Sequence, residues 1–157
     1  MHIVLHQPEI PHNTGAIGRT CLVTGSKLHL IRPYGFFLDE KSLKRSGLDY
    51  WHKLGVYEHD NFTEFAESAR KKFPHGRFFF VETSGGKLYS DVKFEADDFL
   101  IFGSETVGLP QEILREFPEQ IIRIPMKGDE RSLNLSVAAG IVLYEALRQT
   151  GFTGLLY

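Results

Sequence analysis

Short apolar runs alternate with longer polar or amphipathic segments along the whole chain. Runs of about four to seven residues that end at loop-forming residues predict strands. Three of them lack clean polar alternation, which is typical of strands covered on both faces of a sheet. The predicted strands span residues 1–6, 28–31, 77–83, 99–103 and 120–126.

Helix signals fill the segments between these runs. Asn13 can cap a helix that stops before Gly25, and Asn61 can cap another that ends before Pro74. Pro110 is well placed as the first residue of a third helix. The predicted helices span residues 13–24, 38–45, 61–72, 110–117 and 133–149.

Strands that alternate with helices predict an α/β fold around a mostly parallel sheet flanked by helices. With 157 residues and neither a repeat nor a linker, the chain is expected to form a single domain over residues 1–157. Ligands of such sheets bind at the carboxyl ends of the strands. The candidate functional loops are therefore those after Ile31, Thr83, Phe102 and Met126.

The first and last predicted helices carry apolar residues on two faces. In the last helix one stripe includes Leu133, Val137 and Tyr144, and a nearly opposite stripe includes Leu135 and Val142. Burial between the sheet and a neighbouring helix of the same chain would explain both stripes. A homodimer built on the two helices would explain them equally.

Charge and composition narrow the class of protein. Eighteen Lys and Arg against 20 Asp and Glu give a net charge of -2, so any nucleic-acid site must come from a local basic patch. The one cysteine, Cys21, cannot form a disulfide within the chain. The start of the sequence lacks the pattern of a signal peptide, and the longest apolar stretch is far shorter than a membrane span. A cytoplasmic protein without membrane contact is expected.

Common catalytic motifs are missing from the sequence. It has no GxGxxG after a strand, no GxxxxGK[ST], no HExxH and no GxSxG. Its single cysteine and scattered histidines make no zinc site, and no metal is expected. His2 and His6 could share a strand face, but two ligands are too few for a metal site.

Three glycine-containing loops remain as candidates for chemistry. They are residues 13–20 (NTGAIGRT), 102–110 (FGSETVGLP) and 124–126 (IPM), which KGDE with Gly128 joins to 131–136 (RSLNLS). Glycine lets a ligand approach the backbone closely, and amides at a helix start can bind an anion. Each loop alone also has a plain structural reading, as a capped surface helix, a long turn or an N-cap.

Taken together, the three loops resemble the three motifs of the SPOUT methyltransferases, knotted enzymes that methylate RNA with S-adenosylmethionine. The segments PEIPHNTG, RPYGF, RSGLDYW, FGSETVGLP, IPM, RSLNLS and YEALRQ are most similar to the minimal YibK/TrmL-type group. That group methylates the ribose 2′-oxygen of the tRNA wobble nucleotide, either cytidine or modified uridine. The resemblance covers essentially the whole chain.

The resemblance implies a C-terminal trefoil knot, formed from about Val81 onward, and a homodimer packed through the first and last helices. It also implies a site for S-adenosyl-L-methionine built from the three knot loops. The cofactor-binding residues would be Val81, Thr83, Gly103, Leu109, Ile124, Met126, Ser132, Leu133 and Asn134.

The resemblance assigns three further residues to catalysis. Arg19 is the family's proposed catalytic residue, Glu105 would face the methyl-transfer region, and Tyr144 matches a tyrosine associated with the dimer and the substrate site. Many relatives have asparagine where this chain has Ala16, so nucleotide preference is left open. Because an arginine is almost never deprotonated at pH 7, we expect Arg19 to position the RNA and stabilise the developing oxyanion, not to act as the general base.

RNA binding is expected to use a local patch of basic and aromatic side chains around RSGLDYW, namely Lys44, Arg45, Tyr50 and Trp51. A second basic cluster, Arg70, Lys71 and Lys72, is as easily a solvated helix face. Two alternatives to a tRNA enzyme stay open. One is a ribosomal RNA ribose methyltransferase, and the other is a non-catalytic RNA-binding protein of the same fold.

Overall fold

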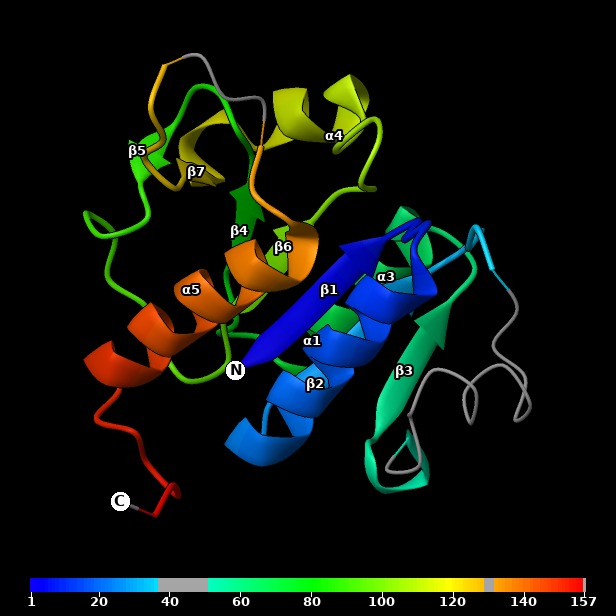
Figure 1. Cartoon of the computed structure of the whole chain (residues 1–157), viewed down its shortest axis with the longest axis vertical. Coiled ribbons are helices and arrows are strands. Elements are labelled where there is room, and N and C mark those ends of the chain that lie inside the picture. The colour runs from blue at the N-terminus through cyan, green and yellow to red at the C-terminus, as the bar shows by residue number, and fades with distance from the viewer. Residues whose placement is uncertain (37–50, 129–131, 157) are drawn as a thin grey trace.

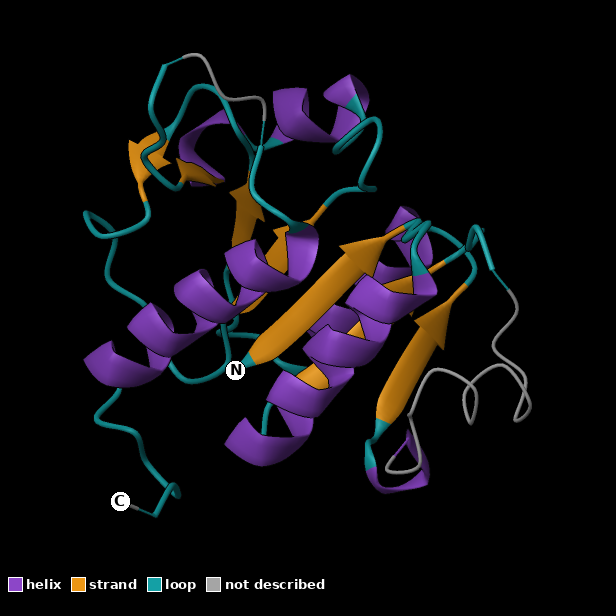
Figure 2. Cartoon of the chain, viewed as in Figure 1, coloured by secondary structure: helices purple, strands orange, loops and turns teal. Residues whose placement is uncertain are grey.

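A parallel β-sheet forms the centre of the molecule (Figures 1 and 2). The structure is a computed structural model that describes residues 1–36, 51–128 and 132–156. Within these ranges seven strands lie in the order β3-β2-β1-β6-β4-β7-β5, and every pairing between them is parallel. The strands are β1 His2–His6, β2 Lys27–Ile31, β3 Val56–His59, β4 Phe78–Val81, β5 Lys87–Leu88, β6 Phe99–Phe102 and β7 Ile121–Arg123. The predicted fold class is confirmed.

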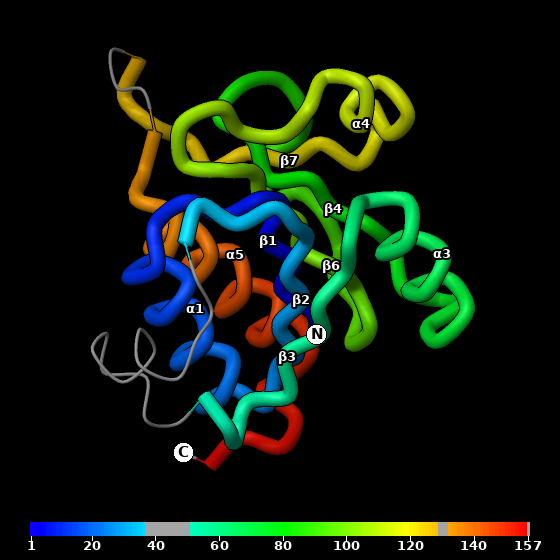
Figure 3. The backbone as a smooth tube through the Cα atoms, turned by 90° about the vertical axis from the view of Figure 1, so that its right-hand side faces the viewer, coloured from blue at the N-terminus to red at the C-terminus, as the bar shows by residue number. Residues whose placement is uncertain are grey.

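Helices cover both faces of the sheet. Figure 3 shows α1 and α5 side by side on one face and α3 on the other. Ile17 of α1 and Val142 of α5 pack with Leu100 of β6 in one buried cluster, whereas Phe65 of α3 packs with Phe99 in the second. The helices are α1 Pro11–Thr24, α3 Phe62–Lys72, α4 Gln111–Glu116 and α5 Leu135–Gln149, and short 3-10 turns span Trp51–Lys53 and Pro118–Gln120.

The helix ends follow the sequence signals at most positions. Asn61 caps α3 by accepting a hydrogen bond from the Glu64 N–H, 2.9 Å long. Gly25 closes α1 in the left-handed conformation at φ 66°, which glycine adopts without strain. The helices predicted to begin at Pro110 and Leu133 begin at Gln111 and Leu135, with Pro110 and Asn134 in the N-cap positions.

The prediction that Asn13 caps the first helix is wrong. Helix α1 begins two residues earlier, at Pro11, and Ile10 occupies the N-cap position. Proline suits a first helical turn, where its missing N–H would have no partner in any case. Asn13 therefore lies within the first turn, where it is buried and its side chain is available for contacts outside the helix.

Two strands were not predicted from the sequence. β3 is an edge strand whose Tyr57 and Glu58 are exposed, and β5 is only two residues long, so neither presents an apolar run. The helix predicted over residues 38–45 lies outside the described residues. The trefoil knot stays a prediction.

Three buried histidines form a row across β1, β2 and β3. His2 Nδ1 lies 3.0 Å from His29 Nε2, and His29 Nδ1 lies 3.1 Å from His59 Nε2. Each contact needs one N–H and one bare nitrogen, which neutral rings supply. Burial is the main cause that lowers the pKa of His2 to about 3 and that of His29 to about 2. The row lies beneath α3 and contacts Phe65 and Phe99, which marks it as part of the core.

Candidate cofactor and methyl-transfer site

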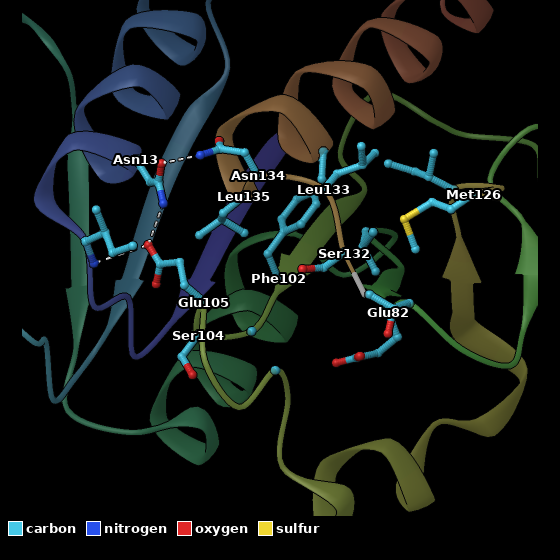
Figure 4. Close-up of a pocket in the computed structure, with 17 residues that line it drawn as sticks. Asn13, Glu82, Phe102, Ser104, Glu105, Met126, Ser132, Leu133, Asn134 and Leu135 are labelled. Carbon is cyan, nitrogen blue, oxygen red and sulfur yellow. Dashed lines mark hydrogen bonds between the residues drawn. The ribbon is translucent and has the colours of Figure 1, made fainter. Parts of the chain in front are cut away.

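A cavity of about 270 Å³ opens at the carboxyl ends of β4, β6 and β7, beside the start of α5 (Figure 4). Parallel strands end at one edge of the sheet, so loops from distant parts of the sequence meet there. Eight of the nine residues predicted to bind a cofactor line this cavity. They are Val81, Thr83, Gly103, Ile124, Met126, Ser132, Leu133 and Asn134.

The ninth, Leu109, is buried next to the cavity and does not line it. Its backbone N–H donates a hydrogen bond of 2.9 Å to Oε1 of Glu82. The Leu109 backbone therefore fixes the Glu82 side chain in the cavity wall. The Leu109 side chain packs in the buried cluster formed with α3 and α4.

The loop after β6 folds back on itself in a tight turn. The Ser104 N–H donates to the Gly108 carbonyl over 3.3 Å, and the Gly108 N–H donates to the Ser104 carbonyl over 3.0 Å. A Cβ on Gly103 would collide with the Gly108 backbone, and Gly108 has a φ of 76°. Both glycines are thus required by the shape of the turn that forms one wall of the cavity.

Glu105 is held by donors from the first loop. Its Oε2 accepts from the Glu9 N–H at 2.8 Å, and its Oε1 accepts from the Ile10 N–H at 3.2 Å and from Asn13 Nδ2 at 3.0 Å. In return Glu9 Oε2 accepts from the Thr106 N–H and hydroxyl, at 3.0 and 2.6 Å. The carboxylate predicted to face the methyl-transfer region lines the cavity, but both of its oxygens are engaged in joining two loops.

Asn13 connects all three loops, a role that the sequence reasoning missed. Besides donating to Glu105, it accepts through Oδ1 from Asn134 Nδ2 at 3.0 Å. Asn134 in turn caps α5 by accepting from the Ser136 N–H and Val137 N–H, at 2.9 and 3.4 Å. Figure 4 shows Asn13 between Glu105 and Asn134 at one side of the cavity, with a dashed line to each. The sequence marks Asn13 as a polar residue of the first loop, but its partners are 92 and 121 residues away and leave no local signal.

Glu82 is a second residue that the sequence reasoning passed over. It lies between two predicted residues, Val81 and Thr83, and lines the cavity. Its Oε1 accepts from Leu109, whereas Oε2 makes no hydrogen bond within the described residues. Because the neighbouring walls include Ile124, Met126 and Leu133, Glu82 offers a free carboxylate oxygen in a largely apolar setting.

Two of the predicted catalytic residues lie outside the cavity wall. Arg19 is exposed on α1 and Tyr144 is exposed on α5, and neither residue lines the cavity. Ala16, the position that departs from many relatives, is half-buried on α1.

The predicted RNA-binding residues are only partly described. Lys44, Arg45 and Tyr50 lie outside the described residues. Trp51 is half-buried against α1, close enough that a Cβ on Gly18 would come within 2.9 Å of its ring.

The second basic cluster lies away from the cavity. Arg70, Lys71 and Lys72 end α3, which runs back from the carboxyl end of β3 to the amino end of β4. Arg70 and Lys72 lie over the rings of Phe78 and Tyr57, at 5.7 and 5.6 Å. These contacts favour the interpretation of the cluster as a helix face that has no role in RNA binding.

Among residues 1–36, 51–128 and 132–156, no group of three His, Cys, Asp or Glu side chains is arranged to hold a metal ion. No helix in these ranges has both the length and the apolar character that crossing a membrane requires.

Comparison with known proteins finds relatives over nearly the full length. The Escherichia coli (strain K12) tRNA (cytidine(34)-2'-O)-methyltransferase is 47% identical over 155 residues, which cover 98% of this chain and 96% of the relative. A solved structure described as "Structural insights into the 2-OH methylation of C/U34 on tRNA" superimposes with a TM-score of 0.87 at 44% identity, covering 96% of this chain and 95% of the other.

More distant structures share the fold and contain a cofactor. The SpoU methyltransferase AviRb from Streptomyces viridochromogenes, in complex with the cofactor AdoMet, superimposes with a TM-score of 0.82 at 27% identity, covering 96% of this chain and 57% of AviRb. The family model described as "SpoU rRNA Methylase family" matches residues 1–144. The match spans the sheet, the cavity and most of α5, and the chain belongs to the SpoU rRNA methylase family.

Proposed function

We propose that this chain transfers a methyl group from S-adenosyl-L-methionine to the ribose 2′-oxygen of the tRNA wobble nucleotide, a cytidine or a modified uridine. Relatives at about 47% identity are named tRNA (cytidine(34)-2'-O)-methyltransferase, and the solved structure at 44% identity concerns methylation of C/U34, which supports this choice of substrate. The observation that carries the proposal is the meeting of loops from β4, β6 and β7 around one cavity.

The lining of the cavity fits an adenosyl group by its chemistry. Ile124, Met126 and Leu133 supply apolar walls, as small-molecule sites commonly do. Gly103 and Gly108 keep the turn after β6 tight, so that its backbone forms one wall of the cavity. The free Oε2 of Glu82 would accept hydrogen bonds from the ribose hydroxyls, in the manner of acidic residues at other nucleotide-binding strand ends.

The bound cofactor would supply a methyl group already activated on a sulfonium. The chain must align the target oxygen with that methyl group and stabilise the charge that develops on the oxygen. Glu105, Asn13 and Asn134 hold the loops in one arrangement. Arg19 would bind the phosphate next to the target ribose and stabilise the oxyanion, because its guanidinium stays protonated at neutral pH.

The active form would be a homodimer packed through α1 and α5. One stripe of α5 is buried within the chain, at Ala139, Val142 and Ala146, whereas Val137 and Tyr144 on the other stripe are 49% and 47% exposed. On α1, Val23 is 59% exposed. Burial within the chain therefore accounts for only one of the two stripes, and a second copy would cover the other.

The partner would be tRNA, which the enzyme meets in the cytoplasm. Its negative backbone would be attracted by local basic groups, since the net charge of the chain is -2. Trp51, Tyr50, Lys44 and Arg45 stay the proposed contacts.

The test is methylation of a defined RNA. The purified chain is incubated with labelled S-adenosylmethionine and tRNA transcripts that carry C34, U34 or a purine at the wobble position, with ribosomal RNA as a competing substrate. Mass spectrometry of the nucleosides should find a 2′-O-methylpyrimidine that is lost when position 34 is a purine. Label in ribosomal RNA alone, or on a base, would contradict the proposal.

A further inference from the structure

A second hollow of about 410 Å³ opens beside the cofactor cavity, at the carboxyl ends of β1, β2 and β6. The hollow and the cavity have Ser104 and Gly108 in common, and Ser104 lies at the edge of the cavity in Figure 4. Since these two residues are hydrogen-bonded to each other, a single tight turn separates the spaces. A ligand in the hollow would therefore lie next to one in the cavity.

Gln7 in this hollow has an unusual backbone. Its φ is 52°, in the left-handed region that residues other than glycine rarely adopt. Its N–H is satisfied by the Ile31 carbonyl at 2.9 Å, but its side-chain amide makes no hydrogen bond within the described ranges. Backbone strain next to an unused amide indicates a functional position.

The rim of the hollow is firmly held. The Tyr34 hydroxyl donates to Glu58 Oε2 at 2.9 Å, which fixes a half-buried ring that lines the space. The Gly35 N–H donates to the Pro8 carbonyl at 2.9 Å, and a Cβ on Gly35 would come within 2.8 Å of the Glu9 backbone. The loops after β1 and β2 are thus closely joined, and the hollow is preformed.

The lining favours a nucleobase over a phosphate. The Glu9 carboxylate on the rim would repel an anion. An aromatic ring, an amide and the imidazole of His6, whose pKa is lowered by burial, are the groups with which proteins stack and hydrogen-bond an unpaired base.

We propose that this hollow holds the pyrimidine base of the nucleotide being methylated, with Gln7 reading its Watson–Crick edge. This rests on the proposed function. A glutamine amide presents a donor beside an acceptor. In one orientation it matches N3 and the 4-amino group of cytosine, and after rotation by half a turn it matches N3–H and O4 of uracil. One residue would therefore accept both pyrimidines.

The test compares Gln7→Leu and Gln7→Gly with wild type on tRNA transcripts that differ only at position 34. Leucine keeps the bulk and removes both polar groups, while glycine relieves the backbone strain and guards against misfolding of the first variant. We expect kcat/KM to fall at least about 10-fold for both C34 and U34 transcripts, since a site built to hydrogen-bond its substrate is sensitive to losing that contact. The dissociation constant for S-adenosylhomocysteine should stay within about twofold, because Gln7 does not line the cofactor cavity.

Gln111→Leu, on the exposed start of α4, is the matched control and should leave all these constants unchanged. Wild-type kcat/KM in both Gln7 variants would overturn the base pocket and leave the proposed function standing. So would a parallel loss of S-adenosylhomocysteine binding, because the hollow would then serve only to support the cavity. A wild-type chain inactive on every pyrimidine-34 transcript would overturn the proposed function and this inference with it.

Discussion

At the residue scale, the site depends on a few side chains that join loops far apart in the sequence. Asn13, Glu105 and Asn134 all lie in segments that the sequence marks as motifs, but Asn13 links the other two only because α1 starts at Pro11 and its side chain lines the cavity. Asn13→Ala would remove two hydrogen bonds and leave Asn134 Nδ2 unpaired. We expect the free energy of unfolding, measured with urea, to fall by about 1–3 kcal/mol. His12→Ala, on the exposed side of the same turn, should change it little.

A substitution of Glu82 tests whether its carboxylate binds the ribose of the ligand. Glu82→Gln keeps the acceptor for the Leu109 N–H but removes the charge, so hydrogen bonds to a ribose would weaken. Calorimetry should show the dissociation constant for S-adenosylhomocysteine rising about 10-fold. Glu112→Gln, exposed on α4, is the control. Equal affinities for wild type and Glu82→Gln would remove Glu82 from the binding site.

Arg19 tests the proposed stabilisation of the oxyanion. Lysine keeps the charge of arginine but loses its planar set of donors, so Arg19→Lys should lower kcat about 100-fold. Binding of S-adenosylhomocysteine should be unaffected, because Arg19 does not line the cavity. Unchanged turnover in this variant would exclude the role.

At the element scale, strands and helices were predictable where a single strong signal exists. The runs that became β4 and β6 are apolar throughout, β1 is apolar at its centre, and Asn61 and Gly25 mark helix ends by local chemistry alone. β3 escaped prediction because Tyr57 and Glu58 face outward at the sheet edge. The position of Asn13 could not be predicted from local preference, since its partners are 92 and 121 residues away.

The buried histidine row of β1, β2 and β3 makes the free energy of unfolding depend on pH. The unfolded chain binds protons on these histidines near pH 6.5, whereas the folded chain holds His2 and His29 neutral down to about pH 3 and 2. The contribution of the neutral histidines to the free energy of unfolding is therefore fully present above pH 6.5 and is lost as the pH falls below that value. His2 and His29 alone predict that the free energy of unfolding falls by about 2.7 kcal/mol per pH unit between pH 6 and 4, and the pKa values of His59 and His6, which burial also lowers, add to this slope.

Urea unfolding at a series of pH values measures this slope. Replacing His29 with phenylalanine should reduce the slope by about 1.4 kcal/mol per pH unit, because one proton fewer is taken up on unfolding. His52→Phe, exposed on the turn before β3, should not change it. A slope near zero in wild type would mean that the buried row is protonated in the folded state.

At the scale of the whole molecule, the resemblance predicted what local patterns could not. Val81, Gly103, Ile124 and Ser132 meet because parallel strands end at one edge of the sheet. The alternation of strands and helices in the sequence predicts that edge, but it does not give the order of the strands.

The homodimer is a prediction about the whole molecule. Val137→Glu should convert it to monomers in sedimentation velocity, whereas Val107→Glu, at an 80% exposed position in the turn after β6, should not. Sedimentation of wild type as a monomer would contradict the dimer.

The central claim is that loops from β4, β6 and β7 form one adenosyl site. A crystal structure of the chain with S-adenosylhomocysteine tests it most directly. We expect density for the adenosyl group in the cavity between Gly103, Ile124 and Val81, within hydrogen-bond distance of Glu82. Density for the ligand at another place on the molecule, with this cavity filled only by water, would contradict it.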